Sequence, residues 1–259
     1  MKKNNCNINI IILLLPLLVL VTLTPVRLSA RCLSDGLELR ARVGYSIGGT
    51  APIGVPATIR SIDAYRLTPS FMAGADLLVA LHQGLGLLAG VHFENKGMDA
   101  DVTTKAYRME MRKGADLIEG LFTGHISQQV KQLMLTVPLQ LTYSFSPKLM
   151  LKAGPYASLL LKRDFSGIAS DGYLRQGDPT GAKILIGDRD GEWATYDFSD
   201  DMRRLQMGVG IGADWRFFRS VGLSLDLNWG LTGIFNSSFK TVEQTLFPIY
   251  GTIAFFYAI

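Results

Sequence analysis

Hydrophobic and polar residues alternate along most of the chain with a period of two. In the clearest case, from Leu205 to Arg216, one side carries Leu, Met, Val, Ile, Ala and Trp, and the other carries Gln, three Gly, Asp and Arg. Alternation of this kind is typical of a β-strand with one apolar face, whereas an amphipathic helix repeats its apolar positions every three to four residues. The pattern therefore predicts a protein built from strands.

Eight segments alternate in this way, each about 8–13 residues long, which is close to the length a tilted strand needs to cross a bilayer. They cover residues 37–48, 69–81, 85–96, 132–143, 149–161, 205–216, 223–230 and 248–259. Short connections at 82–84, 144–148 and 217–221 alternate strictly with long ones at about 49–68, 98–130, 162–203 and 231–246. Outer-membrane barrels have tight periplasmic turns and long extracellular loops. We therefore predict an all-β fold, an eight-stranded antiparallel transmembrane β-barrel with long extracellular loops.

Aromatic side chains gather near the ends of the predicted strands. With both termini in the periplasm, the periplasmic set is Tyr143, Phe145, Trp215, Phe217, Phe255 and Tyr257, and the outer set is Tyr45, Phe71, Phe93 and Trp229. Two aromatic girdles at the two bilayer interfaces are expected of such a barrel. A soluble, lipocalin-like barrel is the alternative, but its inward-facing residues would be apolar, and here they are polar.

The first thirty residues have the features of a secretory signal peptide. Lys2 and Lys3 precede an apolar stretch from Ile10 to Leu23, and the small residues Ser29 and Ala30 follow. The stretch is too short for a spanning helix with ordinary flanks. We therefore predict a cleaved signal peptide over residues 1–30 and a barrel domain over residues 31–259. An N-terminal membrane anchor is the alternative.

Most of the positive net charge of the chain lies in this predicted signal peptide. The full chain of 259 residues has 26 Lys and Arg against 22 Asp and Glu, a formal net charge of +4. Removing Lys2, Lys3 and Arg27 leaves 23 bases against 22 acids, or +1. A nucleic-acid partner is therefore not expected. Removal also takes away Cys6 and leaves one cysteine, so the mature chain has no internal disulfide.

The predicted inward face carries charges of both signs. The acids are Glu38, Asp76, Glu94, Asp214 and Asp226, and the bases are Arg40, Arg42, Lys96, Lys152, Lys162 and Arg216. Eight strands enclose an interior just wide enough for side chains, and an unpaired charge in a dry interior costs several kcal/mol. We therefore predict a plug of ion pairs that closes the lumen. A narrow charged pore is the alternative.

Candidate chemistry rests on three histidines, His82, His92 and His125. His82 falls in a predicted turn. His92 lies on the inward face together with Glu94, near the outer end of the barrel. A catalytic base and the residue that orients it could lie there. The one Gly-x-Ser-x-Gly match, Gly44–Gly48, falls inside a predicted strand and not at the strand-to-helix turn of a nucleophile elbow, and no zinc pattern is present. We therefore predict no catalytic, cofactor-binding or metal-binding residue, no cofactor, and no enzymatic activity.

Four stretches resemble the PorT-like outer-membrane β-barrel proteins of Bacteroidetes, within the OmpA/OmpX-type group of small barrels. They are residues Arg42–Pro52, Phe93–Met98, Leu151–Tyr156 and Ala194–Asp201. The resemblance covers nearly the whole chain after residue 30. It implies an eight-stranded barrel in a Gram-negative outer membrane. The association of PorT with protein secretion implies an accessory role in secretion for this chain.

These observations lead to one functional hypothesis and two alternatives. We expect an integral outer-membrane protein with a structural or binding role through its extracellular loops. Its expected partners are the lipid bilayer and lipopolysaccharide, the barrel assembly machinery and an extracellular ligand or protein, and we expect a monomer. A narrow porin-like channel is the second hypothesis, and a lipid-modifying enzyme at the rim of the barrel is the third.

Overall fold

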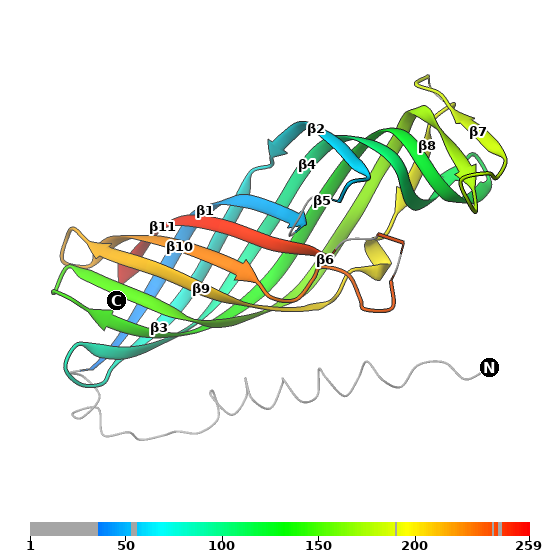
Figure 1. The fold of residues 1–259 in the computed structure, drawn as a ribbon. Coiled ribbons are helices and arrows are strands. Elements are labelled where there is room, and N and C mark those ends of the chain that lie inside the picture. The colour runs from blue at the N-terminus through cyan, green and yellow to red at the C-terminus, as the bar shows by residue number, and fades with distance from the viewer. Residues whose placement is uncertain (1–35, 53–55, 190, 240, 243–244) are drawn as a thin grey trace. The chain divides into compact units, whose positions relative to one another are not determined.

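Antiparallel strands form one 11-stranded sheet in the computed structural model of the chain (Figure 1). The structure describes residues 36–52, 56–189, 191–239, 241–242 and 245–259, so the predicted signal peptide lies outside the described residues. The elements are β1 (Leu37–Pro52), β2 (Ile59–Leu67), β3 (Ser70–Ala80), β4 (Leu85–Lys113), β5 (Asp116–Ser144), β6 (Leu149–Gln176), β7 (Lys183–Ile186), β8 (Ala194–Asp197), the 3-10 turn η1 (Ser199–Asp201), β9 (Leu205–Arg216), β10 (Val221–Gly230) and β11 (Leu246–Ala258). Within the described residues, no helix has the length and hydropathy needed to cross a membrane.

Eight of these strands close into a barrel. The order around the ring is β1, β3, β4, β5, β6, β9, β10 and β11, and the pairing of β11 with β1 joins its ends. β1 and β11 pair from Arg40 opposite Ala258 to Pro52 opposite Leu246. Closure gives the backbone groups of every strand a partner, which a sheet in lipid requires. The predicted eight-stranded antiparallel barrel is therefore confirmed.

The predicted turns also agree with the structure. Short connections at residues 81–84, 145–148 and 217–220 join β3 to β4, β5 to β6 and β9 to β10. β2 and β3 pair with the same edge of β4, one after the other along it. Pro69 separates the two strands, and a proline cannot donate a hydrogen bond to a sheet.

The main difference from the predicted fold is that two of the long loops are largely strands. β4 and β5 are 29 residues long and β6 is 28, so residues 98–130 form a hairpin. That hairpin turns at Gly114, whose φ of 61° favours glycine. The strands were missed because the register shifts between Thr104 and Tyr107 of β4, and such a bulge breaks the two-residue period.

The strand portions beyond the barrel form what we call the extension. It consists of β2, β4 from Met98 onward, β5 up to Val130, β6 from Lys162 onward, β7 and β8. β8 pairs with β6 and also, through Thr195 and Arg112, with β4, so it ties two sides of the extension together (Figure 1). The extension is thus an ordered part of the fold.

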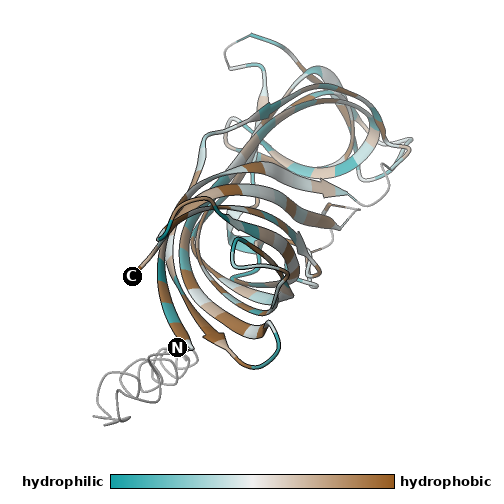
Figure 2. Ribbon diagram, turned by 90° about the vertical axis from the view of Figure 1, so that its left-hand side faces the viewer, coloured by the Kyte–Doolittle hydropathy of each residue, from teal (hydrophilic) through white to brown (hydrophobic). Residues whose placement is uncertain are grey.

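The outward faces of the strands mark where the bilayer ends. Along β4, the outward side chains change from Val91 and Phe93, both exposed, to the acids Asp99 and Asp101. Hydrophobic residues accordingly gather on the strands of the barrel in Figure 2, and the strands of the extension are more hydrophilic. The extension therefore lies beyond the apolar band that faces lipid.

The predicted girdle residues all have exposed side chains, as contact with lipid requires. Their relative exposures run from 37% for Tyr45 to 61% for Phe71 and Phe145. Neighbouring girdle rings touch edge to face: the ring centres of Tyr45 and Phe71 lie 5.7 Å apart, and those of Tyr143 and Phe145 lie 4.8 Å apart. Amphipathic rings in this arrangement suit the two interfaces of a membrane.

Candidate functional site

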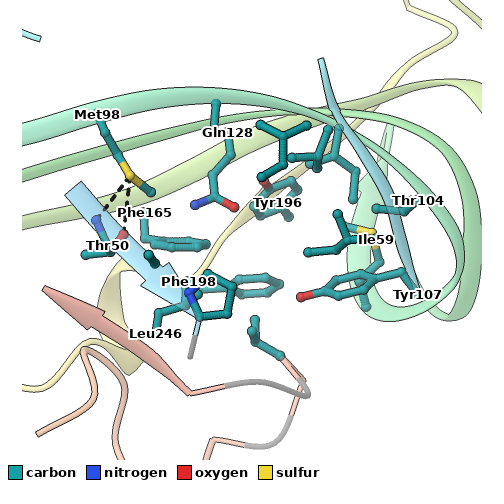
Figure 3. Close-up of a pocket in the computed structure, with 18 of the residues that line it drawn as sticks. Thr50, Ile59, Met98, Thr104, Tyr107, Gln128, Phe165, Tyr196, Phe198 and Leu246 are labelled. Carbon is teal, nitrogen blue, oxygen red and sulfur yellow. Dashed lines mark hydrogen bonds between the residues drawn. The ribbon is translucent and has the colours of Figure 1, made fainter. Parts of the chain in front are cut away.

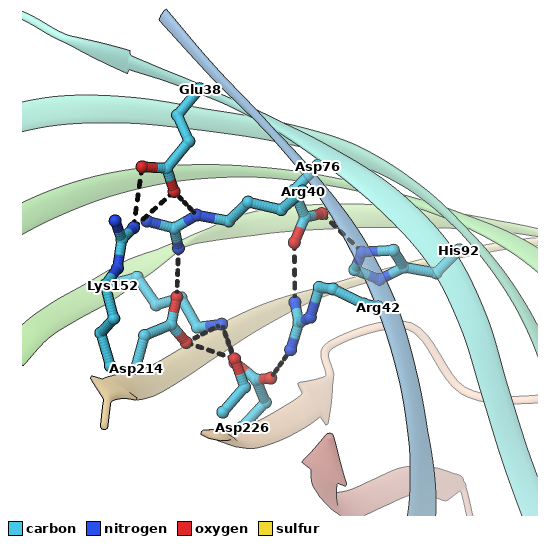
Figure 4. A network of polar contacts seen from close by, with 10 residues as sticks. Glu38, Arg40, Arg42, Asp76, His92, Lys152, Asp214 and Asp226 are labelled. Carbon is cyan, nitrogen blue, oxygen red and sulfur yellow. Dashed lines mark hydrogen bonds and ion pairs between the residues drawn. The ribbon is translucent and has the colours of Figure 1, made fainter. Parts of the chain in front are cut away.

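A network of paired charges occupies the barrel interior (Figure 4). It lies nearer the short turns, because Arg40 and Asp214 line one space together with the turn residue Ser146. Its centre is Lys152, whose side chain is 0% exposed. Lys152 Nζ lies 2.7 Å from Asp214 Oδ1 and 2.8 Å from Asp226 Oδ1. Arg40 Nη1 lies 2.8 Å from the second oxygen of Asp214. One buried cation is therefore shared by two acids, each of which also meets an arginine.

The network continues toward the extension through Arg42 and His92. Arg42 pairs with Asp226 and lies 3.0 Å from Asp76 Oδ2, while His92 Nε2 lies 2.7 Å from the other oxygen of Asp76. One step further, Lys96 Nζ lies 2.8 Å from Glu94. At the opposite end, Arg216 and Arg40 both pair with Glu38. All five predicted acids and five of the six predicted bases are ion-paired, which supports the predicted plug.

The sixth base, Lys162, was wrongly placed in the lumen. Leu160 faces inward and is 5% exposed, whereas Lys162 is exposed to solvent. Here Met134 pairs with Leu160, and the preceding residue, Leu133, pairs with Lys162. The extra residue, Leu161, is a β-bulge that moves the following side chains to the opposite face.

Alternating glycines on β9 make room for the network. A Cβ on Gly212 would collide with Asp226 Oδ1 and would lie 2.7 Å from Lys152 Cε. A Cβ on Gly208 would lie 2.5 Å from the ring of Tyr156. These glycines therefore let large side chains from neighbouring strands fill the lumen.

Little space remains in the lumen around these charges. A polar vestibule of 400 Å³ opens near the short turns, with Glu38, Arg40 and Arg216 among its lining residues. Deeper inside, the space beside Arg42 and His92 has a volume of only 20 Å³. A void of this size holds about one water molecule. The described residues thus close the lumen at this level.

The histidines do not form the arrangement considered from the sequence. His92 is 6% exposed and is bonded to Asp76, not to Glu94, which accepts a hydrogen bond of 2.7 Å from Thr136. His92 is therefore a buried member of the ion-pair network and not a residue of the rim. His125 lies on the outside of the extension, with Nδ1 3.0 Å from Thr103 Oγ1.

The extension has an apolar core, which continues into the adjoining part of the barrel at Met134 and Leu160 and which the alternation pattern did not predict. Phe122, Leu174 and Met202 are 0% exposed, and Phe165 is 2% exposed. The signal that could have revealed it is the concentration of methionines, because five of the nine in the chain belong to this core. They are Met98, Met109, Met111, Met134 and Met202. Methionine fills irregular apolar spaces well.

A pocket of 140 Å³ lies beside this core (Figure 3). Ile62 and Tyr65 of β2, which are 58% and 47% exposed, form part of its wall. The Tyr65 hydroxyl donates to Met98 Sδ at 3.4 Å. Its other lining residues are Thr50, Ala51, Pro52, Ile59, Ala100, Val102, Thr104, Tyr107, Met109, Ile126, Gln128, Phe165, Tyr196, Phe198, Val242 and Leu246.

Comparison with known proteins places the chain in a family. Residues 29–236 match the outer membrane protein beta-barrel domain family, and this match covers most of the chain. The chain belongs to that family, and the protein is a β-barrel of a Gram-negative outer membrane. No curated protein matches the chain.

Solved structures with a similar fold include three small bacterial barrels. Ail, the attachment invasion locus protein of Yersinia pestis, in complex with the heparin analogue sucrose octasulfate, has a TM-score of 0.40 and 9% identity over 86% of this chain and 99% of that chain. Neisserial surface protein A has a TM-score of 0.33 and 9% identity over 86% and 97%. OprG of Pseudomonas aeruginosa has a TM-score of 0.34 and 12% identity over 86% and 96%. Similarity at this level concerns the fold alone.

Proposed function

We propose that this protein is a barrel closed to solutes that binds a partner outside the cell through its extension. The closed lumen and the large, ordered extension together support this role. The lumen beside Arg42 has only 20 Å³ of free space, whereas three strands of 28 or 29 residues build an ordered extension beyond the bilayer. Ordering so many residues costs conformational entropy without adding to the membrane-spanning barrel. A binding role gives that structure a purpose.

The surface of the extension suits contact with a polar partner. A groove of 910 Å³ is lined by charged side chains of both signs, including Arg66, Asp99, Glu110, Arg112 and Asp197. Mixed charges of this kind favour specific recognition and correct orientation of a partner.

The first test concerns the lumen. The purified protein, reconstituted into a planar lipid bilayer, is expected to give no stepwise single-channel currents, because the ion-pair network fills the lumen. A porin inserted under the same conditions provides the positive control. Stepwise currents from the folded protein would contradict the closed barrel and favour the narrow channel.

The second test concerns the extension. A photo-crosslinking amino acid at Ile168, which faces outward beside the groove, is expected to capture a specific partner in intact cells. The same amino acid at Phe218, which is 67% exposed in a short turn at the other end of the barrel, serves as the control. Crosslinks of equal pattern at both positions, or none at Ile168, would argue against binding through the extension.

The finer family assignment belongs to the same proposal. The resemblance of residues 42–52 and 93–98 to PorT-like proteins supports an accessory role in protein secretion. The secretion machinery would then be the partner captured through Ile168. Contact with lipopolysaccharide, insertion by the barrel assembly machinery and a monomeric state remain predictions.

A further inference from the structure

We propose that the 140 Å³ pocket of the extension binds a small, neutral, mainly apolar molecule that carries one hydrogen-bonding group. This inference rests on the proposed binding role of the extension and names the class of ligand for one of its sites. The pocket is walled by the ends of β1 and β11 and by β2, β4, β5, β6 and β8, so seven strands contribute to it.

The volume of the pocket sets the size of the occupant. Its 140 Å³ is close to the roughly 150 Å³ of an apolar cavity known to admit benzene. A single aromatic ring or a short acyl chain therefore fits, whereas a sugar chain or a folded peptide segment does not.

The lining determines the charge of the occupant. None of the pocket's lining residues among the described residues is an Asp, Glu, Lys, Arg or His. Burial, together with the nearby Tyr107, raises the pKa of Tyr196 above its usual range, so its hydroxyl stays neutral. Among these lining residues an ion would find no counter-charge to offset the loss of its hydration, which is strongly unfavourable.

The amide of Gln128 supplies the polar contact. Figure 3 shows this amide pointing toward the middle of the pocket. The next amide along β5, that of Gln129, points outward and donates to Asp99 at 3.1 Å. The Gln128 amide has no hydrogen bond to another described residue. A carboxamide offers both a donor and an acceptor, so a hydroxyl or carbonyl group on the ligand would satisfy it.

The position of the pocket indicates a dissolved ligand and not a lipid tail. Met98, Ala100 and Val102 line the pocket, and the outward residues between them are Asp99 and Asp101. These acids lie beyond the apolar band that faces lipid. The pocket also shares Gln128 and Tyr196 with the polar groove of the extension, which adjoins water.

Methionine methyl groups provide a direct test. The protein would be labelled with carbon-13 at its methionine methyls and placed in lipid nanodiscs, then titrated with benzyl alcohol, toluene and sodium benzoate. Met98 and Met109 line the pocket, whereas Met150 is buried in the lumen near the vestibule and serves as the internal control. Benzyl alcohol and toluene are expected to shift the Met98 and Met109 signals saturably without moving Met150, and benzoate is expected to leave all three unchanged.

Two variants sharpen the test. Ala100→Phe places a ring in the pocket and is expected to abolish the shifts. Gln128→Leu preserves most of the side-chain volume and is expected to weaken benzyl alcohol binding by about 3- to 10-fold, the size of one lost hydrogen bond, with toluene binding changed less than about 2-fold because toluene forms none. Heat-modifiable gel mobility checks that each variant is folded.

Three outcomes would overturn the inference. They are shifts at Met150 equal to those at Met98, binding of benzoate as tight as that of benzyl alcohol, and equal effects of Gln128→Leu on benzyl alcohol and toluene. If Ala100→Phe does not fold, the comparison made with Gln128→Leu decides. The proposed function is tested separately by currents and crosslinks, so an empty pocket in a closed, partner-binding barrel would refute this inference alone.

Discussion

Replacing Lys152 by methionine is expected to lower the free energy of unfolding by about 3–5 kcal/mol. Lys152 has a side chain that is 0% exposed, and its Nζ lies within 2.8 Å of both Asp214 and Asp226. Methionine has a similar length but no charge. Asp214 and Asp226 would therefore lose the positive charge that they share inside the barrel. A buried charge without compensation is destabilising because it cannot regain its hydration.

Urea unfolding of the protein in lipid vesicles measures the effect, and two variants interpret it. Lys131→Met makes the same chemical change at an exposed position and should alter stability by less than about 0.5 kcal/mol. The double variant Lys152→Met with Asp226→Asn restores charge balance and keeps the pairs Arg40–Asp214 and Arg42–Asp76. It should recover at least half of the loss. A single variant as stable as Lys131→Met would show that the network does not hold Lys152 charged.

The barrel and its plug could be predicted because two simple constraints act on every spanning strand. Side chains alternate strictly between lipid and lumen, so Val91 and Phe93 identify the outer face and His92 and Glu94 the inner one. The narrow interior then forces the charges to pair, although the sequence alone could not show which acid meets which base. Asp76, for example, pairs with residues from two other strands, Arg42 and His92.

The extension could not be predicted in the same way. Its strands lie beyond the bilayer, where the outward face is polar and no lipid enforces a regular pattern. Bulges after Thr104 and at Leu161 then reverse which side chains point inward. Residues Tyr107 and Phe165 therefore fall out of phase with the barrel portion of their own strands. The pocket depends on contacts among seven strands, which no local pattern reveals.

Replacing Phe165 by alanine is expected to destabilise the extension by about 3–5 kcal/mol while leaving the barrel intact. Phe165 is 2% exposed, and its ring centre lies 4.8 Å from that of Phe235 and 6.2 Å from that of Phe198. Its removal opens a cavity where β6, η1 and the connection after β10 meet. The ring order of the barrel does not involve these contacts, so the opening should remain local.

Hydrogen exchange read by mass spectrometry separates local from global opening. In Phe165→Ala, amides of β8 should exchange faster, by a factor of about 100 or more for a loss of this size, whereas amides of β10 and β11 should keep their protection. Phe218→Ala, at a site 67% exposed in a short turn, should change neither region. Equal acceleration in β8 and β11 would mean that barrel and extension unfold as one unit. Selective acceleration would mean that the extension is stabilised by its own core, and its conformation could then respond to a bound partner without opening the barrel.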